Sequence, residues 1–370
     1  MPPTELSGRL VSLDAFRGFT IATMILVNNP GTWAAVFPPL EHAEWHGCTP
    51  TDLVFPFFLF IVGVSMTFSF ARRRVSESKG ELYRDIVRRS AIIFALGLFL
   101  ALFPRFDFGE LRVVGVLQRI AIVYLIASLL YLNLSRRALV WTTLGILLGY
   151  WALMSRFPVP GVGPGVLQPD QNFAHWLDRF LVPGRMYRGT WDPEGFTSTF
   201  PAIATTLLGI FTGEWLRSGQ NRPTKARGML LAGVIGMAIG LLWALVLPLN
   251  KHIWTSSYVL FTAGAALSIL ALFYWLIDMK GYRRWAQPLV VFGVNAIAVY
   301  VLSGMVSHLL VEIRIPADGD SLPLKTWLFD HLFAVWAPPY IASLTYALVY
   351  VAIWWAVMAL LYRRRIFIKV

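Results

Sequence analysis

Long runs of apolar residues recur along almost the whole chain, with few charged residues inside them. A membrane-spanning helix needs about 20 mostly apolar residues to cross roughly 30 Å of hydrocarbon. By that length rule the sequence contains about ten candidate spans, at residues 13–29, 52–70, 90–103, 113–133, 138–155, 198–216, 228–247, 255–277, 288–311 and 340–362. The third run is short and ends at Pro104. The pattern predicts an all-α, polytopic integral membrane protein with about ten transmembrane helices.

The composition supports this fold class. Of the 370 residues, 57% are hydrophobic and only 14% are charged, which is too little charge to cover the surface of a soluble protein of this length. No fixed-period repeat is visible. We therefore treat residues 1–370 as a single transmembrane domain.

The formal net charge of +12 would suggest nucleic-acid binding in a soluble protein. Here the basic residues gather between apolar runs, as in loops held on the cytoplasmic side of a membrane, so we expect no nucleic-acid partner. The basic connections and tail contain Arg72, Arg73, Arg74, Lys79, Arg84, Arg88, Arg89, Arg136, Arg137, Arg217, Arg222, Lys225, Arg227, Lys280, Arg283, Arg284, Arg363, Arg364, Arg365 and Lys369. The positive-inside rule then predicts that both termini are cytoplasmic.

The opposite side carries the irregular segments. The longer ones lie near 30–51, 156–197 and 312–339, and shorter ones at 104–112 and 248–254. Long ordered loops in a compact protein are usually functional. These segments are therefore predicted to be extracytoplasmic and to carry a site.

The first of these loops is the densest in reactive side chains. His42 is its best candidate for a proton acceptor, because imidazole titrates nearest neutral pH. Asp52 lies where the second span enters the bilayer, and a carboxylate there needs a partner. His42, His46 and Asp52 have some features of a two-histidine, one-carboxylate metal site, but the spacing is not that of a zinc hydrolase, and we expect no metal. Nothing marks Cys48 as a reactive thiol.

Polar residues also lie within the predicted spans, where charge is costly. They are Asp14 and Arg17 in the first span, Gln118 and Arg119 in the fourth, and Asn295 in the ninth. They form either a polar route for an anionic ligand or internal structural pairs.

Two further loop motifs combine tryptophan with polar groups. Asp192 and Glu194 follow Trp191, and Asn250 precedes Trp254. Such sets can line a sugar or peptide site, because a tryptophan face is apolar and a carboxylate accepts hydrogen bonds from hydroxyls. The alternative is an interfacial aromatic belt with helix-capping polar groups.

Taken together and in order, these motifs resemble the heparan-α-glucosaminide N-acetyltransferase family, in particular its shorter bacterial members. The resemblance covers most of the chain. It rests on Ser12 to Gly18, Val27-Asn28, His42-Ala43 with Trp45 and Gly47, Asp52 to Pro56, Gly115 to Arg119, Asp192 to Gly195, Asn250-Lys251, Trp254 and Ser257 to Val259.

The resemblance implies a multi-pass acyltransferase of the bacterial inner membrane. Lysosomal members of the family move an acetyl group from cytosolic acetyl-CoA to the amine of a terminal glucosamine on the lumenal side. The family's catalytic histidine falls on His42, and an assisting asparagine falls on Asn28. The chain departs from the family in lacking the lumenal N-terminal region and in a longer loop between Asn28 and His42. We therefore expect an acceptor other than heparan, such as another amino sugar or glycan.

These inferences assign the remaining candidate residues. Arg17, Gln118, Arg119 and Asn295 are expected to contact acetyl-CoA, and Asp52, Trp45, Asp192, Glu194 and Asn250 are expected to contact the acceptor. His42 either acts as a general base or is itself transiently acetylated. A transporter or flippase for a sugar-linked substrate is the alternative function. The remaining expected partners are membrane lipid and, from symmetry base rates, a second copy of the chain in a homodimer.

Overall fold

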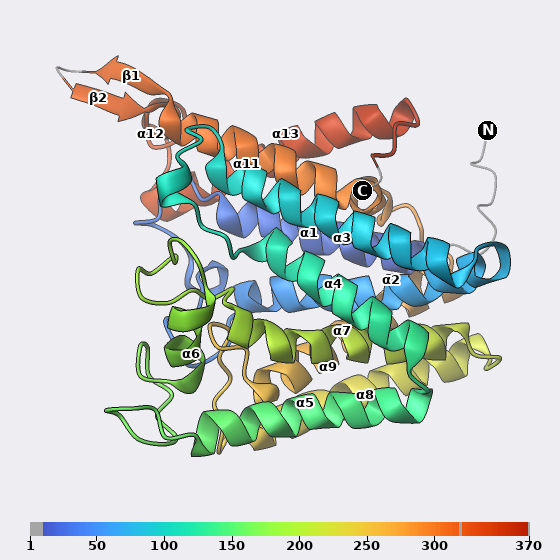
Figure 1. Cartoon of the computed structure of the whole chain (residues 1–370). Helices are drawn as coiled ribbons and strands as arrows, with labels where there is room; N and C mark the ends of the chain where they lie inside the picture. Colours follow the sequence, from blue (N-terminus) through green and yellow to red (C-terminus); the bar gives the residue numbers. More distant parts are fainter. Residues whose placement is uncertain (1–9, 318–319, 369–370) are drawn as a thin grey trace.

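A computed structural model describes residues 10–317 and 320–368. Helices dominate it, and Figure 1 shows the long ones lying side by side in a bundle. The long helices are α1 (Val11–Asn28), α2 (Val54–Ser76), α3 (Lys79–Leu102), α4 (Val116–Asn133), α5 (Arg136–Arg156), α7 (Phe196–Arg217), α8 (Arg222–Trp243), α9 (Ser256–Phe273), α11 (Ala296–Glu312) and α13 (Pro339–Arg363). The prediction of an all-α polytopic membrane protein is confirmed.

The number of spans differs from the expected ten. Within the described ranges, eight helices are long and apolar enough to cross a membrane, and nine if the bent pair α10 (Gln287–Val294) and α11 counts as one. The run at 90–103 is the apolar end of α3, whose last 18 residues still include Asp85, Arg88 and Arg89. Charges in the first half of α3 therefore explain one of the missing spans, and the bend between α10 and α11 explains the other.

Short connections join the helices at one end of the bundle. Ser78, Ser135 and Asn221 cap the first turns of α3, α5 and α8, each accepting a hydrogen bond from the backbone N–H three residues on. Such N-caps satisfy amides that a helix start leaves unpaired, which allows the chain to reverse within a few residues. Many of the arginines named above lie in and beside these turns, so we call this the arginine-rich end.

The opposite end, which we call the loop end, carries the irregular chain (Figure 1). Its short elements are the 3₁₀ helices η1 (Pro38–Leu40), η2 (Pro50–Leu53) and η3 (Phe108–Glu110), helices α6 (Phe173–Leu181) and α12 (Leu324–Leu332), and the antiparallel strands β1 (Arg314–Ala317) and β2 (Asp320–Pro323). The π-helical turn η4 (Tyr274–Met279) continues α9 toward the arginine-rich end. All three predicted long loops therefore lie at one end of the bundle.

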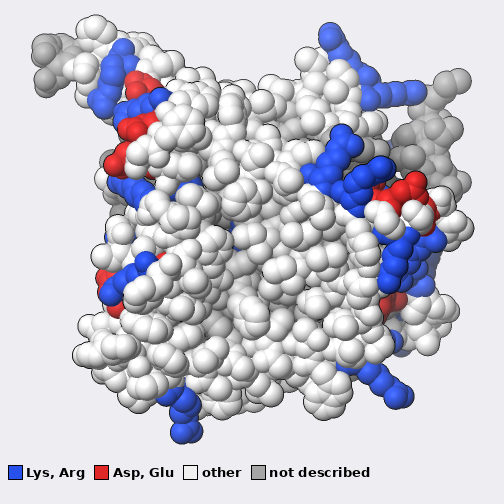
Figure 2. Space-filling view, in the orientation of Figure 1, with Lys and Arg blue, Asp and Glu red and all other residues white. Residues whose placement is uncertain are grey.

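Figure 2 shows charged side chains at both ends of the helices and an uncharged band between them. That band is the surface expected of a protein whose middle faces hydrocarbon. Which end faces the cytoplasm stays a prediction, and the expected basic residue Lys369 lies outside the described residues.

Glycines bring the helix backbones together inside the bundle. A Cβ atom on Gly63 of α2 would lie 2.0 Å from the Thr206 carbonyl oxygen of α7, and one on Gly209 would lie 2.1 Å from the Phe60 carbonyl oxygen. Small residues are the usual means of close approach between membrane helices. The α2–α7 pair therefore packs backbone against backbone.

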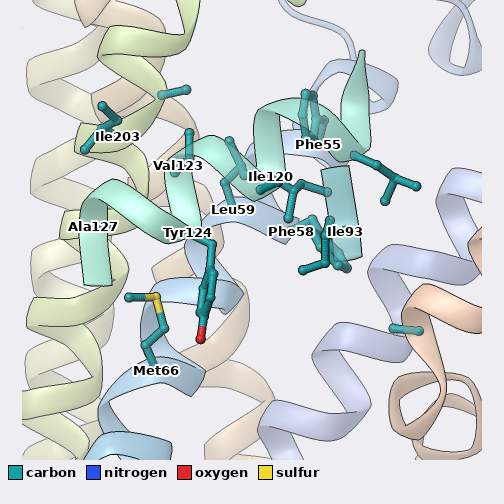
Figure 3. Packing of buried hydrophobic residues seen from close by; sticks show 14 of the residues in the cluster. Phe55, Phe58, Leu59, Met66, Ile93, Ile120, Val123, Tyr124, Ala127 and Ile203 are labelled. Atoms are coloured by element: carbon teal, nitrogen blue, oxygen red, sulfur yellow. The ribbon is translucent and has the colours of Figure 1, made fainter. Parts of the chain in front are cut away.

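The main core lies where α2, α4 and α7 meet. Figure 3 shows Leu59 and Met66 of α2 packing near Val123 and Tyr124 of α4, with Ile203 of α7 beside them. All five side chains are buried. This core fixes the start of α2 and of α7, from which the loop-end site is built.

Candidate functional site

His42 and Asp52 form a hydrogen-bonded pair at the loop end. The His42 Nδ1 atom lies 2.7 Å from Asp52 Oδ1. The Asp52 side chain is 1% exposed, whereas the His42 side chain is 41% exposed. A carboxylate only accepts, so Nδ1 carries the shared proton, and Nε2 keeps the lone pair, which faces Lys251 Nζ at 3.2 Å.

The 3₁₀ helix η2 fixes the Asp52 carboxylate. Oδ2 accepts hydrogen bonds from the backbone N–H groups of Ala43 and Thr49, both at 3.0 Å, and from the Thr49 hydroxyl at 3.1 Å. The Tyr258 hydroxyl of α9 donates to the Asp52 carbonyl oxygen at 2.5 Å. These contacts explain how a buried carboxylate stays satisfied and keeps its other oxygen aimed at His42.

Lys251 completes the group from a distant part of the chain. Its Nζ atom lies 3.0 Å from His42 Nδ1 and 3.2 Å from Nε2, and 3.5 Å from Asp52 Oδ1. Burial lowers the pKa of Lys251, and the Asp52 carboxylate opposes that shift. We call His42, Asp52 and Lys251 the loop-end triad.

Four aromatic rings pack beside the triad. Trp45 stacks on His252 with ring centroids 5.3 Å apart, and His175 stacks on Trp191 at 4.6 Å. Trp45 and Trp191 meet edge to face at 5.4 Å. Burial lowers the pKa of His175 to about 3 and also lowers the pKa of His252, so both rings are neutral near pH 7. This aromatic cluster joins the first loop to α6 and to the 248–254 segment.

Two expected acceptor-binding residues have polar atoms engaged within the protein. The Trp45 Nε1–H donates to the Leu167 carbonyl oxygen at 2.9 Å. The fully buried Asn250 amide donates to His46 Nδ1 at 3.3 Å and accepts from the Ile253 N–H at 3.1 Å. Both residues support the walls of the site in this conformation.

Asp192 and Glu194 share one arginine. Arg112 donates two hydrogen bonds of 2.6 Å to Asp192 and one of 2.5 Å to Glu194. Asp192 also accepts from the backbone N–H groups of Tyr187 and Glu194, both at 2.9 Å. Burial opposes charge on Arg112, but its two carboxylate partners raise its pKa. The buried Asp192 thus holds the loop before α7 in place through its hydrogen bonds. Glu194 contributes a negative charge near Lys251.

Arg119 lies in the first turn of α4, at the loop end. The cation sits 5.0 Å from the Trp254 ring centroid and is 1% exposed. Its guanidinium donates to the carbonyl oxygens of Pro193 and Gly195 and to the hydroxyls of Ser198 and Thr199. The neighbouring Gln118 is buried against Gly97 and Gly115. The Arg119 Nη1 atom is buried without a hydrogen-bond partner among the described residues, and the expected contact of Arg119 with acetyl-CoA stays a prediction.

Arg17 and Asn295 lie in the other half of the bundle. Arg17 donates to Asp14, to the Ser65 hydroxyl and to the Gly293 carbonyl oxygen. Asn295 lies at the 81° bend between α10 and α11. Its amide donates to the Ile366 carbonyl oxygen at 3.1 Å and accepts from the Ile368 N–H at 2.9 Å. The four residues expected to contact acetyl-CoA therefore do not form one cluster.

Asn28 is exposed at the last position of α1, also at the loop end. Among the described residues, no hydrogen bond joins Asn28 to His42.

Burial raises the pKa of Cys48 to about 12, which disfavours its thiolate and agrees with the prediction of an unreactive thiol. Within the part of the chain that the structure describes, no cluster of three metal-ligating side chains occurs.

The sequence reasoning did not single out Lys251, His175 or His252 as site residues. Lys251 and His252 lie between Asn250 and Trp254, in the short segment considered above as a sugar or peptide site. A lysine directly beside a buried asparagine, on the side predicted to be poor in basic residues, was the available signal. Nothing local distinguishes His175 from a surface histidine.

The fold and this site define a polytopic membrane protein with a His–Asp–Lys group at one end, in which the histidine is exposed and the aspartate is buried. A family model for the catalytic region of heparan-α-glucosaminide N-acetyltransferase matches residues 9–241. The chain belongs to this family.

Two curated relatives extend the match over the whole chain. The human heparan-α-glucosaminide N-acetyltransferase is 28% identical over 99% of this chain, and the mouse protein is 26% identical over 100% of it. The chain spans 61% and 62% of the lengths of these two proteins. The resemblance stated from the motifs is thus confirmed at the level of the family.

Proposed function

We propose that the protein transfers an acetyl group from acetyl-CoA to the amine of an amino sugar or related glycan across a membrane. The observation that supports this most directly is the loop-end triad, with the half-exposed His42 held by a buried carboxylate. Family membership supplies the donor class, and the glucosaminide in the relatives' names supplies the acceptor class.

In this proposal His42 is the general base. As the acceptor nitrogen attacks the thioester carbonyl carbon, Nε2 takes a proton from the amine. The C–N bond forms, the C–S bond breaks, and the proton passes on to the CoA sulfur as CoA leaves. Asn28 is proposed to stabilise the oxyanion after a movement of the first loop, because the present geometry does not join it to His42. A transient acetyl-His42 is the competing two-step route.

The donor is proposed to enter from the arginine-rich end, which faces the cytoplasm under the positive-inside rule. Cationic side chains there suit the phosphates of CoA. Arg17 remains a proposed donor contact, as does Asn295 if the 366–368 segment moves away. Arg119 also remains a proposed donor contact through its unpartnered Nη1 atom, while its other nitrogens hold the segment before α7.

The test uses the purified full chain in detergent with ¹⁴C-acetyl-CoA and glucosamine. We expect acetyl transfer, and we expect His42→Gln to lower kcat by about 100-fold or more while calorimetry still detects acetyl-CoA binding. The matched control is His331→Gln, an exposed histidine of α12 whose loss should leave transfer intact. Absence of acetyl-CoA binding by the unaltered protein would reject the proposal.

The bent pair α10–α11 is the observation that favours the transporter alternative, because broken helices often line substrate sites in transporters. Uptake of an amino sugar into proteoliposomes without acetyl-CoA distinguishes the two. The acetyltransferase proposal predicts no such uptake.

A further inference from the structure

Lys251 is placed against both ring nitrogens of His42, at 3.0 and 3.2 Å. We propose that Lys251 is a positioning residue whose charge keeps His42 unprotonated and therefore able to accept a proton. This inference rests on the proposed role of His42 as the base. Neither the motif match nor the proposed mechanism assigns this role to Lys251.

The need for such a charge follows from Asp52. A buried carboxylate 2.7 Å from an imidazole stabilises the protonated ring, as any nearby negative charge does. An imidazolium cannot act as a base. Without a nearby positive charge, the hydrogen bond from His42 to Asp52 would orient the imidazole but would also favour its protonated form, which cannot act as a base.

Lys251 counters that effect at short range. The Asp52 and Glu194 carboxylates favour its charged form against the effect of burial, and its ammonium lies 3.5 Å from Asp52 Oδ1, so the Lys251–Asp52 pair carries no net charge. Protonating His42 would place a second positive charge within 3.2 Å of the first. Only 14% of the Lys251 side chain is exposed, so water screens this repulsion weakly.

The other titratable groups around the triad do not replace this cation. They are Glu41, Glu44, His46 and Cys48 on the first loop, Glu194 before α7, His252 beside Lys251, and Tyr258 of α9. Within the described ranges, the recorded ion pairs and side-chain hydrogen bonds of His42 involve only Asp52 and Lys251.

The backbone holds Lys251 in this place. The Asn250 Oδ1 atom accepts from the Ile253 N–H at 3.1 Å. The backbone of Trp254 has a φ of 50°, which residues other than glycine rarely adopt. The Thr255 N–H closes the turn onto the Asn250 carbonyl oxygen at 3.1 Å. Lys251 therefore projects from a tight, buried turn rather than from a mobile loop.

The first test compares the pH dependence of kcat/KM in the full chain and in Lys251→Met, which removes the charge but keeps the length. The acid limb should move to higher pH by about one unit, because the imidazole binds its proton more tightly when the cation is gone. Activity near pH 6 should fall about tenfold and recover largely at high pH. Lys251→Arg should keep the original limb, and Lys325→Met serves as the matched control because no recorded hydrogen bond or ion pair joins Lys325 to the triad.

The second test needs no acetyl transfer. Diethylpyrocarbonate acylates imidazole in its neutral form and not in its protonated form, so the rate of His42 modification across pH, assigned by fragment mass spectrometry that separates His42 from His46, gives the protonation midpoint. The midpoint should rise by about one pH unit in Lys251→Met, while that of the exposed His331 stays fixed. If Lys251→Met fails to elute as folded protein, Lys251→Gln supplies the same comparison.

The outcomes separate this inference from the proposed function. An unmoved His42 midpoint in a folded, neutral Lys251 variant overturns the role of Lys251, whatever the activity. An equal loss of activity at every pH, with the acid limb of the pH profile unmoved, also overturns this role and indicates that Lys251 is only structural. A shifted midpoint in a protein that transfers no acetyl group keeps the inference and rejects the acetyltransferase proposal.

Discussion

At the residue scale, buried polar groups at the loop end divide into two kinds. Asp192 accepts hydrogen bonds only from the protein itself, and this explains its burial without a ligand, whereas Arg119 donates from two of its nitrogens and leaves a buried Nη1 without a partner among the described residues. His42 differs, since its side chain is 41% exposed, whereas Asp52 is buried and only 14% of the Lys251 side chain is exposed. Exposure of one polar group backed by buried partners is the arrangement expected of a reacting group.

Arg119 offers a residue-scale prediction. Arg119→Met removes a cation that holds two carbonyl oxygens of the segment before α7, and those oxygens then stay buried without a strong donor. We expect a loss of about 3 kcal/mol in the free energy of unfolding, measured by thermal melting in detergent. Arg185→Met, at an exposed arginine of the same end, is the control and should melt like the unaltered protein. Equal melting temperatures for the two variants would contradict the structural role of Arg119.

At the element scale, close helix contacts decide where the loop-end site can form. The helix η2 lies directly before α2, and the segment bound by Arg119 lies directly before α7. The distance between α2 and α7 therefore sets the distance between these two parts of the site. That spacing depends on glycines, because any side chain at Gly63 or Gly209 would overlap the facing backbone.

Gly63→Ala should therefore be costly. Its Cβ atom would meet the Thr206 carbonyl oxygen at 2.0 Å, which forces α2 and α7 apart. We expect a loss of about 1–3 kcal/mol in stability and a matching fall in acetyl-CoA-dependent transfer. Gly145→Ala in α5 is the control, since a Cβ there meets nothing within 4 Å and should be neutral or slightly stabilising. A Gly63→Ala protein as stable as Gly145→Ala would show that the α2–α7 contact tolerates separation.

At the scale of the whole molecule, the two ends differ in charge and in irregular structure. Figure 2 shows the uncharged band that separates them. In the proposed function, the arginine-rich end meets the donor and the loop end meets the acceptor. The membrane then keeps the two substrates apart until they reach the triad.

Orientation follows from the positive-inside rule and is testable by labelling. The only cysteine is Cys48, and burial raises its pKa to about 12, so at pH 7.5 its reactive thiolate is scarce. A membrane-impermeant maleimide on intact cells should label Val162→Cys at the exposed loop end. It should label Gln220→Cys, in the α7–α8 turn, only after permeabilisation. The reverse pattern would place the loop end in the cytoplasm.

Part of this picture could be predicted from the sequence. Apolar runs identify most spans because a bilayer demands a fixed length of apolar helix, as α2, α9 and α13 show. Charge between runs separates the two ends, since loops alternate sides. His42 could likewise be chosen as a candidate from the sequence, because imidazole is the side chain that ordinarily titrates nearest neutral pH.

Only the tertiary structure decides what surrounds those residues. Lys251 reaches His42 across 209 positions of sequence, and Arg112 reaches Asp192 across 80. Such contacts depend on helix packing at Gly63 and Gly209, which no local pattern encodes. The sequence by itself determined a many-span helical protein with a candidate histidine in its first loop. Packing decided that His42 would meet a cation as well as a carboxylate, because burial makes unpaired charge too costly to leave.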